Sequence, residues 1–231
     1  MNARYAIYFA PVRHSPWWNF GAHWLGRDEF DNLPLQQPIP PELPGVPLDG
    51  LTLVPRRYGF HGTLKAPFHL AKNYCEADLL ARLQSFAKTL GPLALGKLHT
   101  KCLGNFVALV PQAEVPGLQA LAAACVIDLD DLRAPLDSKD LVRRDIASLD
   151  VREIELLKCY GYPHVMERFR LHFTLTGPIP ESDIKPVIQA VEGKVSVLNA
   201  QAPLVLDRLC LFREAEAGEP FIRIADFELL T

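Results

Sequence analysis

The sequence has few of the features that mark secreted, zinc-binding or membrane proteins. Its five cysteines are widely spaced, and no two of them form a C-x-x-C pair. An odd, scattered set of cysteines is typical of reduced thiols and does not suit a disulfide framework or a zinc site. The longest apolar run, 120–127, is far too short to span a bilayer, and the first residues contain no signal-peptide core. We therefore expect a soluble, cytoplasmic protein that has no membrane partner.

Basic side chains are also slightly fewer than acidic ones. The chain has 24 Lys plus Arg against 27 Asp plus Glu, which gives a formal net charge of −3. Domains that bind long nucleic acids are usually basic, because their affinity comes from many phosphate contacts. The charge balance therefore disfavours extended nucleic-acid binding and favours a small phosphorylated substrate.

Two stretches that nearly repeat each other stand out from the rest of the chain. One reads Phe60-His61-Gly62-Thr63-Leu64 and the other reads Leu171-His172-Phe173-Thr174-Leu175. Successive side chains of a β-strand point to opposite faces, so each stretch buries its apolar residues and presents a histidine beside a threonine. The sequence thus predicts two strands that bring two histidines and two threonines to one site.

Paired imidazoles suit a reaction that needs one acid and one base. Imidazole titrates near neutral pH, so one histidine can take a proton from the attacking water or hydroxyl while the other protonates the leaving oxygen. Threonine hydroxyls can hydrogen-bond the non-bridging oxygens of a phosphodiester. Because the imidazoles handle both protons, we expect neither a metal nor a cofactor.

The repeated His-x-Thr pattern resembles the 2H phosphoesterase superfamily, which is named after two such motifs. Five short sequence segments around the motifs are similar to a bacterial branch of this superfamily, whose members are labelled phosphonate metabolism proteins of otherwise unknown function. The resemblance implies metal-independent opening or formation of 2′,5′ or cyclic phosphodiesters. It makes His61 and His172 the acid–base pair, and Thr63 and Thr174 the phosphate ligands. The similar segments are Trp24-Leu25-Gly26-Arg27-Asp28, Arg57-Tyr58-Gly59 before the first motif, Lys65-Ala66-Pro67-Phe68 after it, Arg133-Ala134-Pro135-Leu136 and Gly161-Tyr162-Pro163.

Four further residues are candidate substrate ligands. Lys65 extends the outward-facing row past Thr63 and could offset phosphate charge, although a solvated lysine fits the pattern equally well. Arg57 and Arg170 lie close to the motifs in the sequence and are weaker candidates. Tyr58 could reach the site through its hydroxyl, although strand alternation points its ring toward the core.

The rest of the chain predicts an α+β fold in which strand, helix, strand and strand occur twice in that order. We expect a single 2H phosphoesterase-like domain over residues 1–231, with two lobes whose His-x-Thr strands face each other across a central cleft. Lobe one spans about 1–115, a helical connection about 116–165 and lobe two about 166–231. The helices expected after the motifs are 76–90 and 182–192, and the strands are 5–10, 95–101, 105–110, 204–212 and 221–229.

Two segments outside this repeat have their own predictions. The density of prolines in 33–54 excludes regular structure, so we expect a long loop that either covers the site or is a surface insertion. Segments 138–147 and 148–160 have the pattern of two short helices.

Two other functions fit part of the pattern. A protein that keeps the fold but only binds a nucleotide or an RNA end would have no need for both imidazoles, so the intact motifs favour an enzyme. A metal hydrolase built on His61, His69 and His172 would lack H-E-x-x-H, paired carboxylates and cysteine pairs. The sequence leaves open which histidine is the base and which phosphate ester is the substrate.

Overall fold

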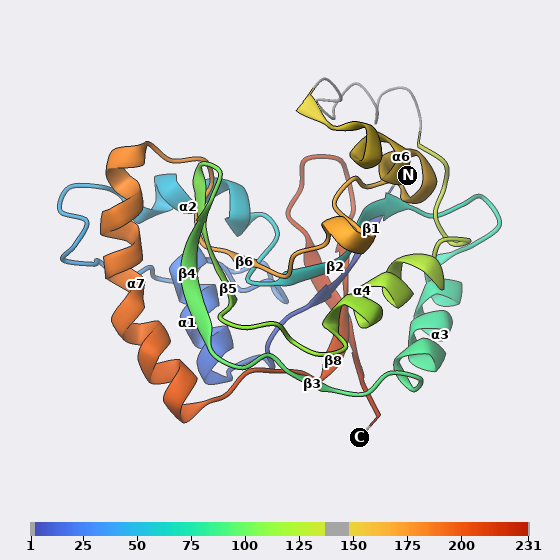
Figure 1. Ribbon diagram of the computed structural model, residues 1–231, viewed down its shortest axis with the longest axis horizontal. Helices are drawn as coiled ribbons and strands as arrows, with labels where there is room; N and C mark the ends of the chain where they lie inside the picture. Colours follow the sequence, from blue (N-terminus) through green and yellow to red (C-terminus); the bar gives the residue numbers. More distant parts are fainter. Residues whose placement is uncertain (1–2, 137–147, 231) are drawn as a thin grey trace.

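The structure, a computed structural model, describes residues 3–136 and 148–230 (Figure 1). These residues form a mixed α/β fold around one seven-stranded sheet in the order β4-β5-β6-β2-β1-β8-β9, in which every paired strand is antiparallel. A second, two-stranded sheet pairs β3 with β7. The strands are β1 Arg4–Phe9, β2 Gly62–His69, β3 Leu93–Ala94, β4 Leu98–Leu103, β5 Phe106–Pro111, β6 Phe173–Thr174, β7 Val205–Leu206, β8 Arg208–Glu214 and β9 Ile222–Glu228.

Helices gather at both ends of the sheet. In Figure 1, α1, α2 and α7 lie together at one end, and α3 and α4 lie at the other. α7 contacts β4 and β5, whereas α3 contacts β8 and β9. The α-helices of the described residues are α1 Pro16–Leu25, α2 Leu48–Arg56, α3 Glu76–Ala87, α4 Leu118–Ile127, α6 Val151–Tyr160 and α7 Glu181–Gln201, and a 3₁₀ helix, η2, covers Met166–Arg168.

Local sequence explains where several helices begin and end. The Ser15 side chain accepts a hydrogen bond from the Trp18 backbone N–H, and this satisfies a free donor at the start of α1. Asp150 and Glu153 form a reciprocal capping box at the start of α6. That helix ends at Gly161, which adopts a φ of 77° that favours glycine.

Alternation along β1 divides the interior into two cores. Ile7 and Phe9 point into the larger core, to which α3 and α7 also contribute their apolar sides. Tyr8 and Ala10 point to the opposite face, where a smaller apolar cluster forms with residues of β8. Tyr8 of this smaller cluster lies directly against His61 of the first motif.

The expected order of elements is present, and the motif strands meet, but a central cleft between two lobes is not confirmed. The run strand, helix, short strand, strand and strand occurs from β2 to β5 and again from β6 to β9. The motif strands lie side by side and not on opposite lobes, because Gly62 of β2 pairs with Phe173 of β6 inside one sheet. Strands from 1–115 and 166–231 are interleaved in that sheet, because β6 lies between β5 and β2. The lobe boundaries and a duplicated 2H unit stay predictions.

Several segment predictions change in detail. The proline-rich segment 33–54 is not wholly irregular, because α2 begins inside it at Leu48, directly after Pro47, where a missing backbone N–H costs nothing. Pro55 lies in the last turn of that helix. The helix predicted at 138–147 lies outside the described residues. No helix among residues 3–136 and 148–230 combines the length and apolarity that a membrane crossing requires.

Candidate active site

The two motifs meet where β2 and β6 pair. Gly62 and Phe173, the middle residues of the two His-x-Thr motifs, are directly opposite each other in the sheet. A Cβ atom on Gly62 would lie 2.6 Å from Cδ1 of Leu171, which is closer than side chains tolerate. A side chain at position 62 would therefore have to displace Leu171 of the second motif.

His61 is held in one orientation by its neighbours. Its Nδ1 is 2.9 Å from the carbonyl oxygen of Gly59, and since a carbonyl only accepts, Nδ1 donates this bond. The neutral ring then carries its lone pair on Nε2, which is 3.2 Å from Oγ1 of Thr63. The ring of Tyr8 stacks on the imidazole with centroids 3.8 Å apart. These contacts present Nε2 of His61 beside the Thr63 hydroxyl.

His172 repeats the same local geometry. Its Nδ1 is 2.8 Å from the carbonyl oxygen of Arg170, again two residues earlier in the chain. Phe106 of β5 lies beside the ring with centroids 5.9 Å apart. Each motif histidine is therefore oriented by its own backbone; Nε2 of His61 lies against the Thr63 hydroxyl, whereas no partner of His172 Nε2 is found among the described residues.

The electrostatics of the pair keep His61 neutral. Burial lowers the pKa of His61 to about 4, even though the hydrogen bond to Gly59 acts to raise it. Positive charge on His172 and Arg27 lowers the same pKa further. His61 is thus an unprotonated imidazole at neutral pH and feels the charge of its partner.

A pocket of about 310 Å³ opens beside these motifs. Thr63 and His172 line it together with Arg170, whose guanidinium has no hydrogen bond or ion pair among the described residues. Its other wall comes from the segment after α6 and includes Tyr162, His164 and Arg168, with Glu153 of α6 itself. Beyond the quoted segment Gly161-Tyr162-Pro163, this wall was not predicted from the sequence, although it directly precedes the second motif in the chain.

The remaining predicted site residues fall into different places. Lys65 is buried and not solvated: its ammonium donates to the Val126 carbonyl at 3.0 Å and to Asp130 at 3.1 Å. Thr174 is half-buried in β6 and does not line the 310 Å³ pocket. His69 of the metal alternative binds the Ala3 carbonyl near the far end of β2.

Arg57 and Tyr58 both lie close to Phe221. The Arg57 guanidinium forms an ion pair with the buried carboxylate of Glu214 and lies 5.9 Å from the Phe221 ring centroid. Tyr58 stacks on Phe221 and has its ring centroid 6.2 Å from that of His61. Of these two candidates, Tyr58 lies near His61, whereas Arg57 is held by Glu214.

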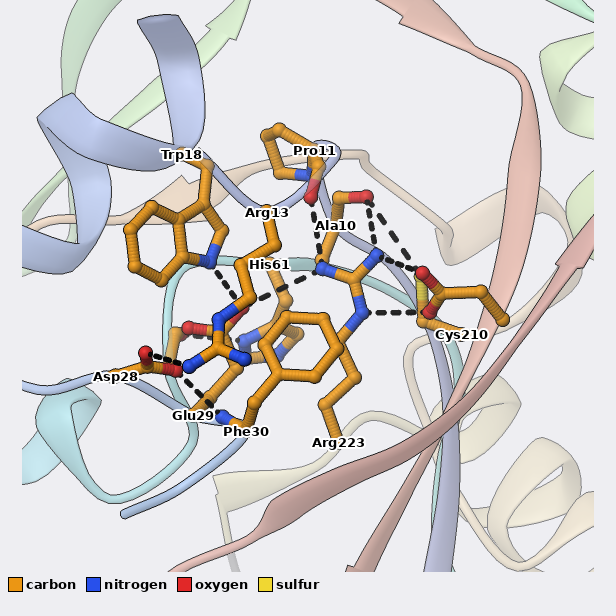
Figure 2. Close-up of polar contacts among 12 residues, drawn as sticks. Ala10, Pro11, Arg13, Trp18, Asp28, Glu29, Phe30, His61, Cys210 and Arg223 are labelled. Atoms are coloured by element: carbon orange, nitrogen blue, oxygen red, sulfur yellow. Dashed lines mark hydrogen bonds and ion pairs between the residues drawn. The ribbon is translucent and has the colours of Figure 1, made fainter. Parts of the chain in front are cut away.

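A buried charge network supports the backbone beside His61 (Figure 2). The carboxylate of Glu29 accepts from Nε1 of Trp18 at 2.8 Å and from Nη1 of Arg223 at 3.4 Å. Gly59 packs so closely on Glu29 that a Cβ atom there would lie 2.9 Å from Cβ of Glu29. Because the Gly59 carbonyl orients His61, this network fixes the position of the catalytic candidate. Its residues are scattered in the sequence, and no local pattern indicates them.

Comparison with known proteins places the chain in a family. A family model described as "Protein of unknown function (DUF1045)" matches residues 63–222, most of the chain. The chain belongs to the DUF1045 family. The matched part of this DUF1045 chain contains Thr63 and the whole second motif, and His61 lies just outside it.

Two curated relatives of this DUF1045 chain are named ribose 1,5-bisphosphate phosphokinase PhnN. The protein from Janthinobacterium sp. (strain Marseille) is 38% identical over 222 residues, which cover 95% of this chain and 49% of that protein. The protein from Laribacter hongkongensis (strain HLHK9) is 35% identical over 218 residues, which cover 94% of this chain and 50% of that protein. The chain spans about half the length of these curated relatives.

Proposed function

We propose that the protein is a metal-independent phosphodiesterase that acts on a small cyclic or 2′-linked phosphate ester. The observation that carries the proposal is the matched orientation of the two histidines. In each, Nδ1–H donates a hydrogen bond to the backbone carbonyl two residues earlier. The two motifs pair directly through Gly62 and Phe173. A structural histidine has no need for this arrangement twice at one place.

The two imidazoles have different tasks in this mechanism. His61 is neutral, so its Nε2 takes a proton from the attacking water. His172 in its protonated form donates a proton to the leaving ester oxygen as the bond from phosphorus to that oxygen breaks. The Thr63 hydroxyl and the Arg170 guanidinium bind the non-bridging oxygens, whose charge grows in the transition state. The product is a phosphate monoester.

The names of the relatives fit a phosphorylated ribose as the substrate. Both refer to a kinase that acts on ribose 1,5-bisphosphate, but those proteins are about twice as long as this chain. The sequence has no G-x-x-x-x-G-K-[ST] phosphate loop, the usual mark of one large kinase class. We therefore assign the kinase activity to the half of the relatives that this chain does not cover, and a ribose phosphodiester to this half.

Turnover of nucleoside 2′,3′-cyclic phosphates tests the proposal. We expect purified protein to open these esters to monoesters without added metal, and we expect His61→Ala and His172→Ala to abolish that activity. Tight nucleotide binding without turnover in the unaltered protein would show a binding protein instead. Activity that disappears with a chelator and returns with zinc would support metal catalysis.

A further inference from the structure

A second pocket next to the candidate active site is lined by positive charge. Arg4 of β1, Lys65 of β2 and Arg133 all line it, and none of its described lining residues is an aspartate or glutamate. Its volume of about 20 Å³ leaves room for a small group but not for a sugar ring or a base. The lining selects for a compact anion.

The carboxylates nearest to this pocket do not balance its cations. Arg4 and Arg57 share the single carboxylate of Glu214. Lys65 and Arg133 share the single carboxylate of Asp130, with contacts of 3.1 and 2.9 Å. Three lining cations are therefore paired with two carboxylates, one of which is shared with Arg57 outside the pocket, so among the described residues the pocket keeps an excess of positive charge.

This excess charge is buried, which makes it costly without a ligand. The side chains of Arg4, Lys65 and Arg133 are only 13%, 4% and 11% exposed. Burial lowers the pKa of Lys65, which means that the pocket already resists the charged form of this amine. A bound anion would relieve the cost by charge-assisted hydrogen bonds.

The pocket adjoins the one that contains the second motif histidine. Ala66, Tyr162 and Val165 line both pockets, so they form a shared wall. Lys65 follows Thr63 by two residues in β2, a step of roughly 7 Å along an extended strand. One small molecule can therefore reach both the Thr63 hydroxyl and the Lys65 ammonium.

We propose that this pocket holds a second phosphate group of the substrate, with Arg4, Lys65 and Arg133 as its ligands. The substrate is then a phosphodiester that also carries a phosphate monoester about one sugar away. The substrate role of the pocket rests on the proposed phosphodiesterase function, whereas its affinity for phosphate does not.

Two substrates that differ only in the second phosphate test the pocket. We compare hydrolysis of adenosine 2′,3′-cyclic phosphate with hydrolysis of the same compound bearing a 5′-phosphate. The added phosphate should lower KM roughly 10- to 100-fold, as expected for one or two charge-assisted hydrogen bonds. Inorganic phosphate should compete with the 5′-phosphorylated compound and not with the other.

Matched variants assign the effect to the pocket. Arg4→Gln leaves Arg57 to pair with Glu214, so this change removes a pocket cation without stranding a buried acid. Arg133→Gln leaves Lys65 to pair with Asp130 and serves as a second, independent variant. The control is Arg213→Gln. This change also removes one guanidinium, from the residue next to Glu214 in β8, but Arg213 pairs with Glu76 and does not line the pocket.

The outcomes separate the pocket from the proposed function. The proposal requires that both pocket variants lose the advantage of the 5′-phosphate while the control keeps it. Equal KM values for the two substrates, pocket variants that behave like the control, or equal effects of inorganic phosphate on both substrates would overturn it. If neither compound is hydrolysed, the proposed function fails. Calorimetric titration with inorganic phosphate then tests by itself whether the pocket binds an anion. Binding weakened by Arg4→Gln but not by Arg213→Gln then supports the pocket, and any other result rejects it.

Discussion

The phenol ring of Tyr8 stacks on the imidazole of His61, with centroids 3.8 Å apart and an interplanar angle of 25°. Tyr8 is almost fully buried in the small core on this face of the sheet, so its ring is a fixed surface. The stack limits rotation of the histidine and shields one face of it from water. Both effects favour a neutral imidazole whose Nε2 has a defined direction.

Replacing the Tyr8 ring should weaken turnover by misorienting His61. We expect Tyr8→Leu to lower kcat roughly 2- to 10-fold, in line with the energy of one aromatic pair, and to move the pKa of His61 back toward its ordinary value. Tyr8→Phe keeps the ring and should keep the activity. Equal rates for the Leu and Phe variants in steady-state assays would show that the stack does not position His61.

Removal of either motif imidazole should remove one proton transfer. We expect His61→Ala and His172→Ala each to lower kcat by roughly 100- to 10,000-fold, the usual contribution of general acid or base catalysis. His99→Ala is the matched control, because His99 is exposed in β4 and belongs to neither motif. Thermal unfolding of all three variants would distinguish lost catalysis from lost folding.

The low pKa of His61 predicts how stability depends on pH. The pKa of about 4 in the folded protein lies below the ordinary value near 6.5, so the unfolded chain binds more protons between these values. The contribution of neutral His61 to stability is therefore complete above about pH 6.5 and falls as the pH drops toward 4. Urea unfolding at several pH values should show a shallower decline for His61→Gln. Parallel curves for the two proteins would contradict a depressed pKa.

A side chain at Gly62 should separate the two motifs. We expect Gly62→Ala to destabilise the protein by about 1–3 kcal/mol, because its Cβ would overlap Leu171, and to lower kcat as the histidines move apart. Gly193→Ala is the control, since nothing lies within 4 Å of a Cβ at that position in α7. That change should be neutral or stabilising, because alanine favours a helix. Denaturant unfolding and turnover of both variants provide the test.

Chelation should leave the activity intact. Proton transfer by two imidazoles supplies both the base and the acid, so the mechanism has no step that needs a metal ion. We expect equal kcat before and after dialysis against EDTA, with a bell-shaped dependence of kcat on pH. A loss that only added zinc reverses would assign the reaction to metal catalysis.

The two motifs could be predicted from the sequence because their information is local. Alternation of Leu171, Phe173 and Leu175 with Arg170, His172 and Thr174 indicates which residues are buried, and the structure buries the apolar set. The helices after each motif follow from apolar spacing, and α3 and α7 are present where the sequence predicts helices. The sequence therefore determined the order of elements that follows each motif and the candidate histidines.

Tertiary structure decided which distant segments meet these motifs. The order of strands in the sheet places β6 directly beside β2, and no local pattern shows that Gly62 faces Phe173. The burial of Lys65 depends on α4 and Asp130, which are about sixty residues away in the sequence. The stack of Tyr8 on His61 likewise joins β1 to the residue just before β2, which are far apart in the chain. Periodicity reports only whether a side chain is buried, whereas the identity of its neighbours follows from packing the whole chain.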